Sequence, residues 1–265
     1  MNATFVEHDG LLLACRVSGR EGAPWIVLSN SLGATMAMWE PQLALLEPHF
    51  RVLRYDTRGH GASGVPPEPY RFHDLIGDVV ALMDHHGIAR AAFMGLSLGG
   101  MTAMGLALAH PGRFERIICC DTRADAPPPF QQGWIERLAA VDEGGLGRIV
   151  GGTMERWFAP DWRALNPAAL AAVEAAFLAT PVEGYRGCVA AIRTLDYLKD
   201  LGRITVPMLY VCGSADMAAP VAAMQAMAEA TPGARFAVIE GGAHLPNIDR
   251  SAQFNRAIAG FLGIP

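Results

Sequence analysis

The fold expected of this chain is decided by one stretch, Ala91-Ala92-Phe93-Met94-Gly95-Leu96-Ser97-Leu98-Gly99-Gly100. An apolar run of strand type leads directly into Gly-x-Ser-x-Gly, and a helical pattern continues from Leu98 to about His110 before Pro111-Gly112. A strand that passes straight into a helix turns sharply, so the serine occupies strained backbone and its small neighbours allow close packing. The stretch therefore predicts a nucleophile elbow with Ser97 at a helix N-terminus.

Short apolar runs alternate with helical patterns on both sides of this stretch, which is typical of a parallel sheet with helices on both faces. Asp9-Gly10 is a strong hairpin signal and predicts that the sheet opens with an antiparallel pair. We expect strands over residues 4–8, 11–17, 25–29, 51–55, 91–96, 116–120, 207–212 and 235–239. The fold class is thus α/β, with a mostly parallel central sheet flanked by helices.

The alternation stops after the sixth expected strand. Pro127-Pro128-Pro129 breaks the chain, and the segment that follows contains helical patterns but no expected strand. The helical patterns lie at 134–141, 147–158, 167–179 and 181–200. We therefore expect a core of residues 1–122 and 204–265, with residues 123–203 forming an all-helical cap over the carboxyl ends of the strands, where open α/β folds bind ligands.

Composition narrows the possible partners. The chain has 265 residues, 51% of them apolar, and a formal net charge of −5 without a basic cluster, which argues against nucleic acid. We read no signal peptide in the first residues and no apolar run long enough for a membrane span. Five cysteines without a Cys-x-x-Cys pair suggest reduced thiols, so we expect a cytoplasmic protein. No group of histidines and carboxylates has metal-ligand spacing, so no metal is expected.

To act as a nucleophile, a serine hydroxyl needs a base that accepts its proton and an acidic residue that orients this base. His244 is the best placed of the eight histidines, because it lies in the loop after the last expected strand. Asp216 directly follows the strand at 207–212. The order Ser97, Asp216, His244 is the order expected when a catalytic triad is mounted on this fold.

Other polar residues near strand ends have alternative interpretations. Asp121, after the strand at 116–120, is the second candidate for the acid. Asp249 is expected to cap the last helix. His60, in Asp56-Thr57-Arg58-Gly59-His60-Gly61-Ala62-Ser63, is interpreted as a structural residue of a tight turn near the site.

An oxyanion hole requires two N–H donors directed at one point. The residue after the nucleophile, Leu98, is expected to supply one. The other is expected from the loop Ser29-Asn30-Ser31-Leu32-Gly33, where the Ser31 amide is favoured by position and Asn30 and Leu32 are its near alternatives.

Taken together, these motifs resemble the α/β-hydrolases, and within them the 3-oxoadipate enol-lactonases. The narrower resemblance rests on several short motifs: Ser29-Asn30-Ser31-Leu32-Gly33 with Met38-Trp39 and Pro41-Gln42, Leu96 to Met101, Arg156-Trp157-Phe158, and Gly184-Tyr185 with Cys188 and Ala190-Ala191-Ile192. One departure is Cys120-Asp121-Thr122-Arg123-Ala124, where the family carries a Cys-Asn-Thr-Ala-like stretch. The resemblance implies a serine acyl-transfer enzyme that opens a small-molecule lactone or ester without a cofactor. A homodimer is compatible with it.

A lactone that carries a carboxylate also needs a cation in the pocket. Arg123, at the entrance to the expected cap, is the first candidate, and Arg137 and Arg156 are the alternatives. Trp134, Trp157 and Phe130 are candidates for the pocket wall. A carboxylesterase with an apolar pocket, and a ligand receptor that keeps the triad, are the competing functions.

Overall fold

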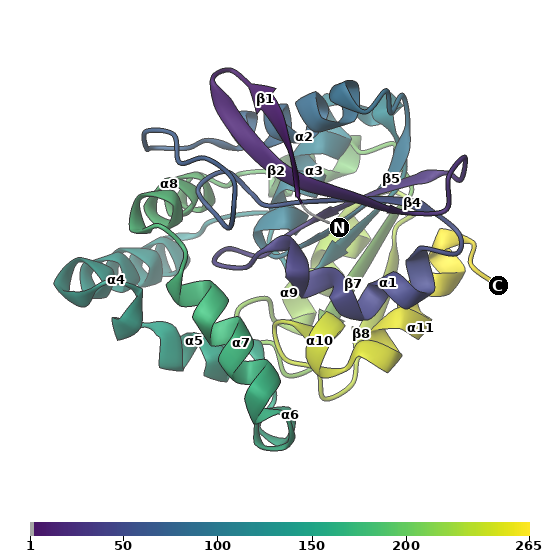
Figure 1. The fold of residues 1–265 in the computed structure, drawn as a ribbon. Coiled ribbons are helices and arrows are strands. Elements are labelled where there is room, and N and C mark those ends of the chain that lie inside the picture. Colours follow the sequence, from purple (N-terminus) through teal and green to yellow (C-terminus); the bar gives the residue numbers. More distant parts are fainter. Residues whose placement is uncertain (1–2) are drawn as a thin grey trace.

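A single eight-stranded sheet forms the centre of the computed structural model, which describes residues 3–265 (Figure 1). Its strands are β1 Thr4–His8, β2 Leu11–Gly19, β3 Trp25–Ser29, β4 Arg51–Tyr55, β5 Ala91–Leu96, β6 Phe114–Cys120, β7 Met208–Gly213 and β8 Arg235–Ile239. They are arranged in the order β1-β2-β4-β3-β5-β6-β7-β8. The predicted strands are confirmed, with ends displaced by two residues at most.

The sheet is antiparallel only at its first edge. β2 pairs antiparallel with both β1 and β4, and all other neighbouring strands are parallel. The turn between β1 and β2 is Asp9-Gly10, where both residues have positive φ, 50° and 78°, as a tight hairpin requires. β5 and β7 are buried at every residue, which explains their continuous apolar sequences.

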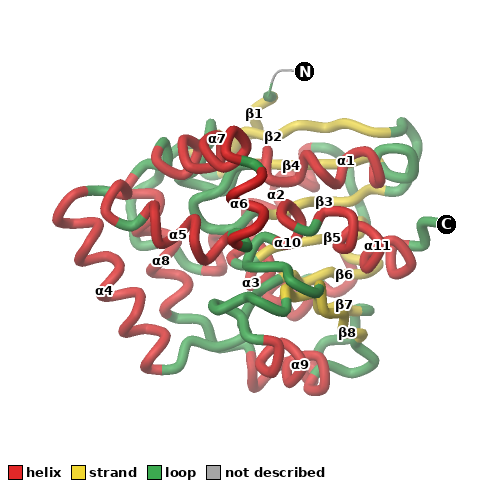
Figure 2. The backbone as a smooth tube through the Cα atoms, turned by 90° about the horizontal axis from the view of Figure 1, so that it is seen from below, coloured by secondary structure: helices red, strands yellow, loops and turns green. Residues whose placement is uncertain are grey.

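Helices cover both faces of the sheet (Figure 2). On one face α1 packs against α11, and on the other α2 packs against α3, which also contacts β5 and β6. Helix α9 contacts β7 and β8. The bounds of these helices are α1 Glu40–Leu46, α2 Phe72–His85, α3 Leu98–Ala109, α9 Val221–Ala230, α10 Pro246–Asp249 and α11 Ser251–Leu262. The predicted α/β fold class is thereby confirmed.

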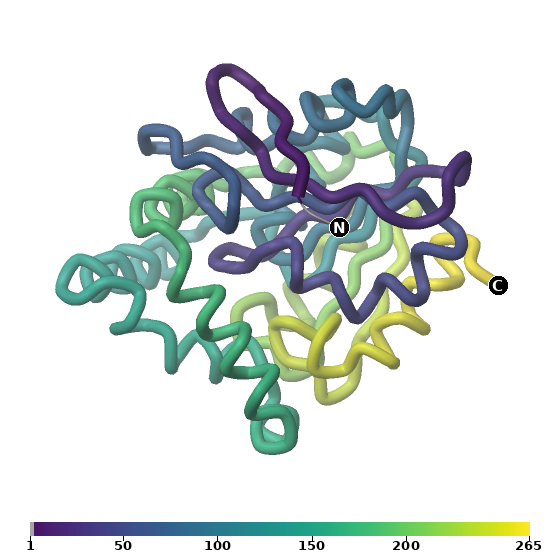
Figure 3. Tube along the Cα trace, viewed as in Figure 1, coloured from purple at the N-terminus to yellow at the C-terminus, as the bar shows by residue number. Residues whose placement is uncertain are grey.

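Five further helices lie between β6 and β7, beside the sheet rather than on its faces (Figure 3). They are α4 Pro128–Gly144, α5 Val150–Trp157, α6 Pro160–Leu165, α7 Pro167–Leu178 and α8 Val182–Arg193. The prolines at 127–129 do not interrupt a helix, because they start one: Pro127 is the N-cap residue of α4. Proline fits the first helical turn, whose N–H groups have no partner within the helix.

The described part of the chain, residues 3–265, contains no helix with the length and apolar content needed to span a bilayer.

Candidate active site

Ser97 lies at the sharp turn between β5 and α3 and has φ 55° and ψ −110°. Positive φ is strained for a residue with a side chain. The surrounding glycines explain how the turn is accommodated: a Cβ on Gly95 would lie 2.1 Å from the Gly99 carbonyl oxygen, and one on Gly99 would lie 2.3 Å from that of Ser29. Glycine is therefore required on both sides of the serine so that strand and helix can meet.

Backbone hydrogen bonds hold the elbow to the neighbouring strand ends. The Ser97 amide donates to the Cys120 carbonyl oxygen at 2.8 Å, and the Gly99 amide donates to that of Asn30 at 3.0 Å. The Thr122 hydroxyl donates to the Ser97 carbonyl oxygen at 2.8 Å. The serine is thus positioned by the ends of β3 and β6 as well as by its own helix.

His244 and Asp216 are in direct contact, although they are 28 positions apart in the chain. Nδ1 of His244 lies 2.8 Å from Oδ2 of Asp216, and the Asp216 side chain is fully buried. Burial acts to raise the pKa of Asp216, but the charge and hydrogen bond of His244, with the amides of Ala218 and Ala219, outweigh it and lower that pKa. Asp216 is therefore held as a carboxylate against the imidazole.

Ser97 and His244 line one cavity of about 480 Å³ at the carboxyl ends of the strands, a volume in the range of small-molecule sites. Residues from the inserted helices form its opposite wall. Of the residues predicted for the site, Ser31, Ser97, Arg123, Phe130, Trp134, Trp157 and His244 line this cavity, as do the alternatives Leu32, Asp121, Arg137 and Arg156.

The two other aspartates behave differently from Asp216. Asp121 is fully buried, lines the cavity and accepts a hydrogen bond from the Gly213 amide at 2.8 Å. The prediction that Asp249 caps the last helix is wrong. Asp249 ends α10, and its Oδ2 accepts from the amides of Ala159 and Ala243. It therefore connects the inserted helices to the loop that carries His244.

The backbone amides near Ser97 differ in their availability. The Ser31 amide, which the sequence favoured as an oxyanion donor, donates to Sδ of Met38 at 3.4 Å. Within residues 3–265, no hydrogen bond engages the amide of Leu32 or that of Leu98. The Asn30 side chain donates to the Tyr55 carbonyl oxygen and accepts from Nε1 of Trp39. The amides of Leu98 and Leu32 are thus free of competing hydrogen bonds.

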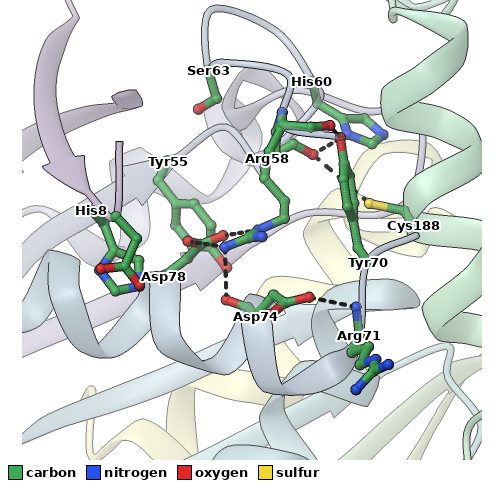
Figure 4. A network of polar contacts seen from close by, with 12 residues as sticks. His8, Tyr55, Arg58, His60, Ser63, Tyr70, Arg71, Asp74, Asp78 and Cys188 are labelled. Carbon is green, nitrogen blue, oxygen red and sulfur yellow. Dashed lines mark hydrogen bonds and ion pairs between the residues drawn. The ribbon is translucent and has the colours of Figure 1, made fainter. Parts of the chain in front are cut away.

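The loop after β4 packs against the loop that follows β3. His60 is fully buried, its Nε2 accepts the Gly33 amide at 2.9 Å, and its Nδ1 lies 3.1 Å from the Arg58 carbonyl oxygen. Burial lowers the pKa of His60 to about 4, so its ring is neutral. Arg58 forms a two-pronged ion pair with Asp78 in α2, both contacts at 2.7 Å (Figure 4). These contacts fix the loop that carries the Leu32 amide.

The arginines of the cavity differ in how their charge is balanced. Arg123 lies 3.4 Å from the carboxylate of Asp125 and 4.8 Å from the ring centroid of Phe130. Arg137 instead donates to two neutral oxygens, the Tyr185 hydroxyl at 2.6 Å and the Thr153 hydroxyl. Among the described residues no carboxylate forms an ion pair with Arg137. Sequence patterns could not identify this arrangement, because its three residues come from α4, α5 and α8.

Metal ligands were also sought in the described part of the chain. No group of three or more His, Cys, Asp or Glu side chains there is arranged to hold a metal ion.

Comparison with known proteins identifies chains that are similar over most of their length. A family model described as the alpha/beta hydrolase fold matches residues 24–251. The protein 3-oxoadipate enol-lactonase 2 of Acinetobacter baylyi is 35% identical over 240 residues, which cover 91% of this chain and 89% of that protein.

Two solved structures extend the similarity. The enol-lactonase from Burkholderia xenovorans LB400 has a TM-score of 0.94 and 40% identity, covering 98% of this chain and 100% of that one. A thermophilic esterase from Thermogutta terrifontis has a TM-score of 0.91 and 26% identity, covering 99% of this chain and 98% of that one. Both similarities extend over nearly the whole chain.

Proposed function

The chain belongs to the α/β-hydrolase fold family and is an enzyme acting on ester bonds, and from this premise we propose that it opens a carboxylated enol-lactone of the 3-oxoadipate type. In this proposal Ser97 is the nucleophile, His244 the base and Asp216 the acid. The segment 123–203 is the cap and the remainder is the catalytic core. The contact between His244 and Asp216, and the cavity that Ser97 and His244 share, support these roles.

The first half of the reaction is an acyl transfer to Ser97. Because Nδ1 of His244 is bound to Asp216, Nε2 is left to accept the proton of the Ser97 hydroxyl as its oxygen attacks the ring carbonyl. The amides of Leu98 and Leu32 stabilise the resulting oxyanion, and Leu32 replaces Ser31 in this role because Met38 engages the Ser31 amide. The C–O bond of the ring then breaks, and the enol oxygen leaves with the proton from His244.

The second half releases the acid. The enol settles as a ketone, which makes its departure easy. His244 then takes a proton from a water molecule, whose oxygen attacks the acyl carbon, and Ser97 leaves with that proton. No step of this proposed reaction uses a cofactor.

The observation that carries the choice of substrate is the charge of Arg137. Its guanidinium lines the cavity of Ser97 and is held in a fixed orientation by Tyr185 and Thr153, yet neither partner neutralises it. An arginine with free hydrogen-bonding capacity is well suited to a substrate carboxylate. Arg123 is a weaker candidate because Asp125 already balances its charge.

A carboxylesterase for uncharged substrates is the second candidate. It is favoured by the apolar side chains of the cavity, among them Leu32, Met101, Ile149 and Trp157. A ligand receptor on the same fold would retain its biological effect in a Ser97→Ala variant, whereas an enzyme would lose it.

Steady-state kinetics on two substrates separate these functions. The wild-type enzyme and Arg137→Gln are assayed with 3-oxoadipate enol-lactone and with a short, uncharged aryl ester. Since a hydrogen bond to a charged group contributes about 1.5–3 kcal/mol, we expect R137Q to reduce kcat/KM for the lactone by about 10- to 100-fold. The same variant should change kcat/KM for the ester by less than about threefold.

Arg148→Gln is the matched control, because Arg148 is an exposed arginine outside the cavity. It should leave both substrates unaffected. A wild-type preference of about a hundredfold or more for the uncharged ester, equal to about 2.7 kcal/mol, would refute the lactonase proposal and leave the carboxylesterase.

A further inference from the structure

Asp121 is an acidic residue at the centre of the site that the proposed reaction does not use. It follows β6, its side chain is fully buried, and it has a positive φ of 44°. Its neighbours Cys120 and Thr122 both bond the backbone of Ser97. The backbone strain and the burial indicate that the surrounding structure holds this carboxyl group in one position.

The hydrogen bonds of Asp121 leave one of its oxygens without a conventional donor. Oδ1 accepts the Gly213 amide at 2.8 Å, whereas Oδ2 is buried and receives no N–H or O–H group from the described residues. The carboxyl group of Asp216 lies close enough to that of Asp121 to affect its protonation. Two carboxyl groups form a hydrogen bond only when one of them carries a proton.

The two aspartates are not equivalent as proton carriers. Asp216 receives His244 on Oδ2 and the Ala218 amide on Oδ1, and both donors stabilise its anion. Asp121 receives a single amide from the described residues, that of Gly213. Of the two carboxyl groups, that of Asp121 is therefore the one suited to carry a proton, and its unpartnered Oδ2 is the site for it.

The charged and titratable groups around Asp121 favour the same assignment. Asp216 follows β7, Asp249 ends α10, and the thiols of Cys120 and Cys212 lie in β6 and β7. His244 contacts Oδ2 of Asp216. Burial first, and then the negative charge of Asp216, raise the pKa of Asp121 well above its ordinary value, while the Gly213 amide opposes them.

We propose that Asp121 is a neutral carboxylic acid in the folded enzyme and donates a hydrogen bond from Oδ2 to Asp216, which positions Asp216 for His244. Asp121 is a positioning residue, since it acts on the reaction through Asp216. This donor stabilises the Asp216 anion without adding a second buried charge. The catalytic part of the proposal rests on the function proposed above, but the protonation of Asp121 does not.

The first test measures protonation without any substrate. Urea unfolding is compared for the wild type and Asp121→Asn from pH 4 to pH 8. An acid that stays protonated in the fold loses its proton on unfolding above pH of about 4, so the wild-type unfolding constant should rise relative to that of D121N by about tenfold per pH unit. The rise should stop at the folded-state pKa of Asp121. In infrared spectra, a carboxylic acid C=O band should be present in the wild type and absent in D121N.

Glu136→Gln, on the exposed side of α4, is the control and should show no such trend. A ratio of unfolding constants for wild type and D121N that stays constant between pH 4 and pH 8 would show that Asp121 is ionised in the fold and would overturn the proposal. Neither measurement uses turnover, so an enzyme inactive on lactones would refute the proposed function and leave this test intact.

The second test concerns positioning. Asp121→Ala removes the donor and should lower kcat by at least about tenfold, whereas D121N supplies an N–H donor to Asp216 and should restore kcat to within about threefold of the wild type at neutral pH. At alkaline pH the wild type should lose activity as Asp121 ionises, and D121N should lack this loss. If D121N is as slow as D121A and keeps the wild-type pH profile, the hydrogen bond to Asp216 has no positioning role.

Discussion

Ser97 and Asp121 show at the residue scale how the site is built from strained positions on adjacent strands. Both residues have positive φ, 55° and 44°, although neither is glycine. Such conformations cost about 1–3 kcal/mol each and persist only where their surroundings enforce them. Here the enforcement comes from the hydrogen bond between the Ser97 amide and Cys120 and from the bond between the Asp121 amide and Val211.

The proposed triad makes a prediction about single and double variants. Ser97→Ala and His244→Ala should each lower kcat by about 10⁴- to 10⁶-fold, and the double variant should be no slower than the slower single variant, because the two residues act as one unit. Steady-state kinetics and trapping of Ser97 by a fluorophosphonate, followed by mass spectrometry, measure this. Additive losses, or labelling of another serine, would contradict the assignment.

His60 predicts how stability depends on pH. Its pKa falls from 6.5 in the unfolded chain to about 4 in the fold, so the unfolded state binds the extra proton between these values. The neutral His60 ring therefore contributes fully to the free energy of unfolding above pH 6.5. This contribution, about 3 kcal/mol in total, is lost as the pH falls to 4.

Urea unfolding at pH 7 and pH 4 measures this loss. His60→Gln keeps an acceptor and a donor but does not titrate, so it should lose about 3 kcal/mol less than the wild type between the two pH values. His73→Gln, at an exposed position of α2, should follow the wild type. Equal losses for the wild type and H60Q would show that His60 is not buried as a neutral ring.

At the scale of elements, the placement of α8 depends on a contact between two glycines. A Cβ on Gly184 would lie 2.1 Å from the Gly59 carbonyl oxygen, and one on Gly59 would lie 2.4 Å from the Cα of Gly184. This contact joins α8 to the loop that carries His60. Tyr185, the next residue, holds Arg137, so the same contact positions the cation of the cavity.

Gly184→Ala should therefore destabilise the protein by about 1–3 kcal/mol, because backbone atoms cannot move aside as a flexible side chain can. Gly260→Ala is the matched control, since that glycine lies in α11 with no atom within 4 Å of an added Cβ, and it should stabilise the protein by about 0.5–1 kcal/mol. Urea unfolding measures both. A neutral G184A would mean that α8 does not depend on this contact.

At the scale of the whole molecule, all five cysteines are free and buried. Burial raises the pKa of each thiol, so little thiolate is present to react. We predict that an alkylating reagent labels none of them in the native protein and all of them in urea, and that a reductant leaves Tm unchanged. Rapid labelling under native conditions, detected by mass spectrometry, would contradict this.

The sequence by itself determined the elements of the fold and the positions of the chemical groups along it. Apolar runs and turn residues predicted each strand, because two-sided burial demands apolar residues and tight turns demand glycine. Ser97, Asp216 and His244 are the predicted triad because functional side chains of this fold lie in the loops that follow strands, and the end of a strand is visible locally. The positive φ of Ser97 likewise follows from its short, local motif.

Only the tertiary structure decided which of several similar side chains and amides is free to act in the cavity. Asp125 neutralises Arg123, while Tyr185 and Thr153 hold Arg137 without neutralising it. Met38 engages the Ser31 amide and leaves that of Leu32 free, and burial and the charge of Asp216 raise the pKa of Asp121. The physical reason is the same in each case: charge balance, hydrogen-bond satisfaction and proton affinity depend on neighbours that are distant in the chain, which only folding brings together.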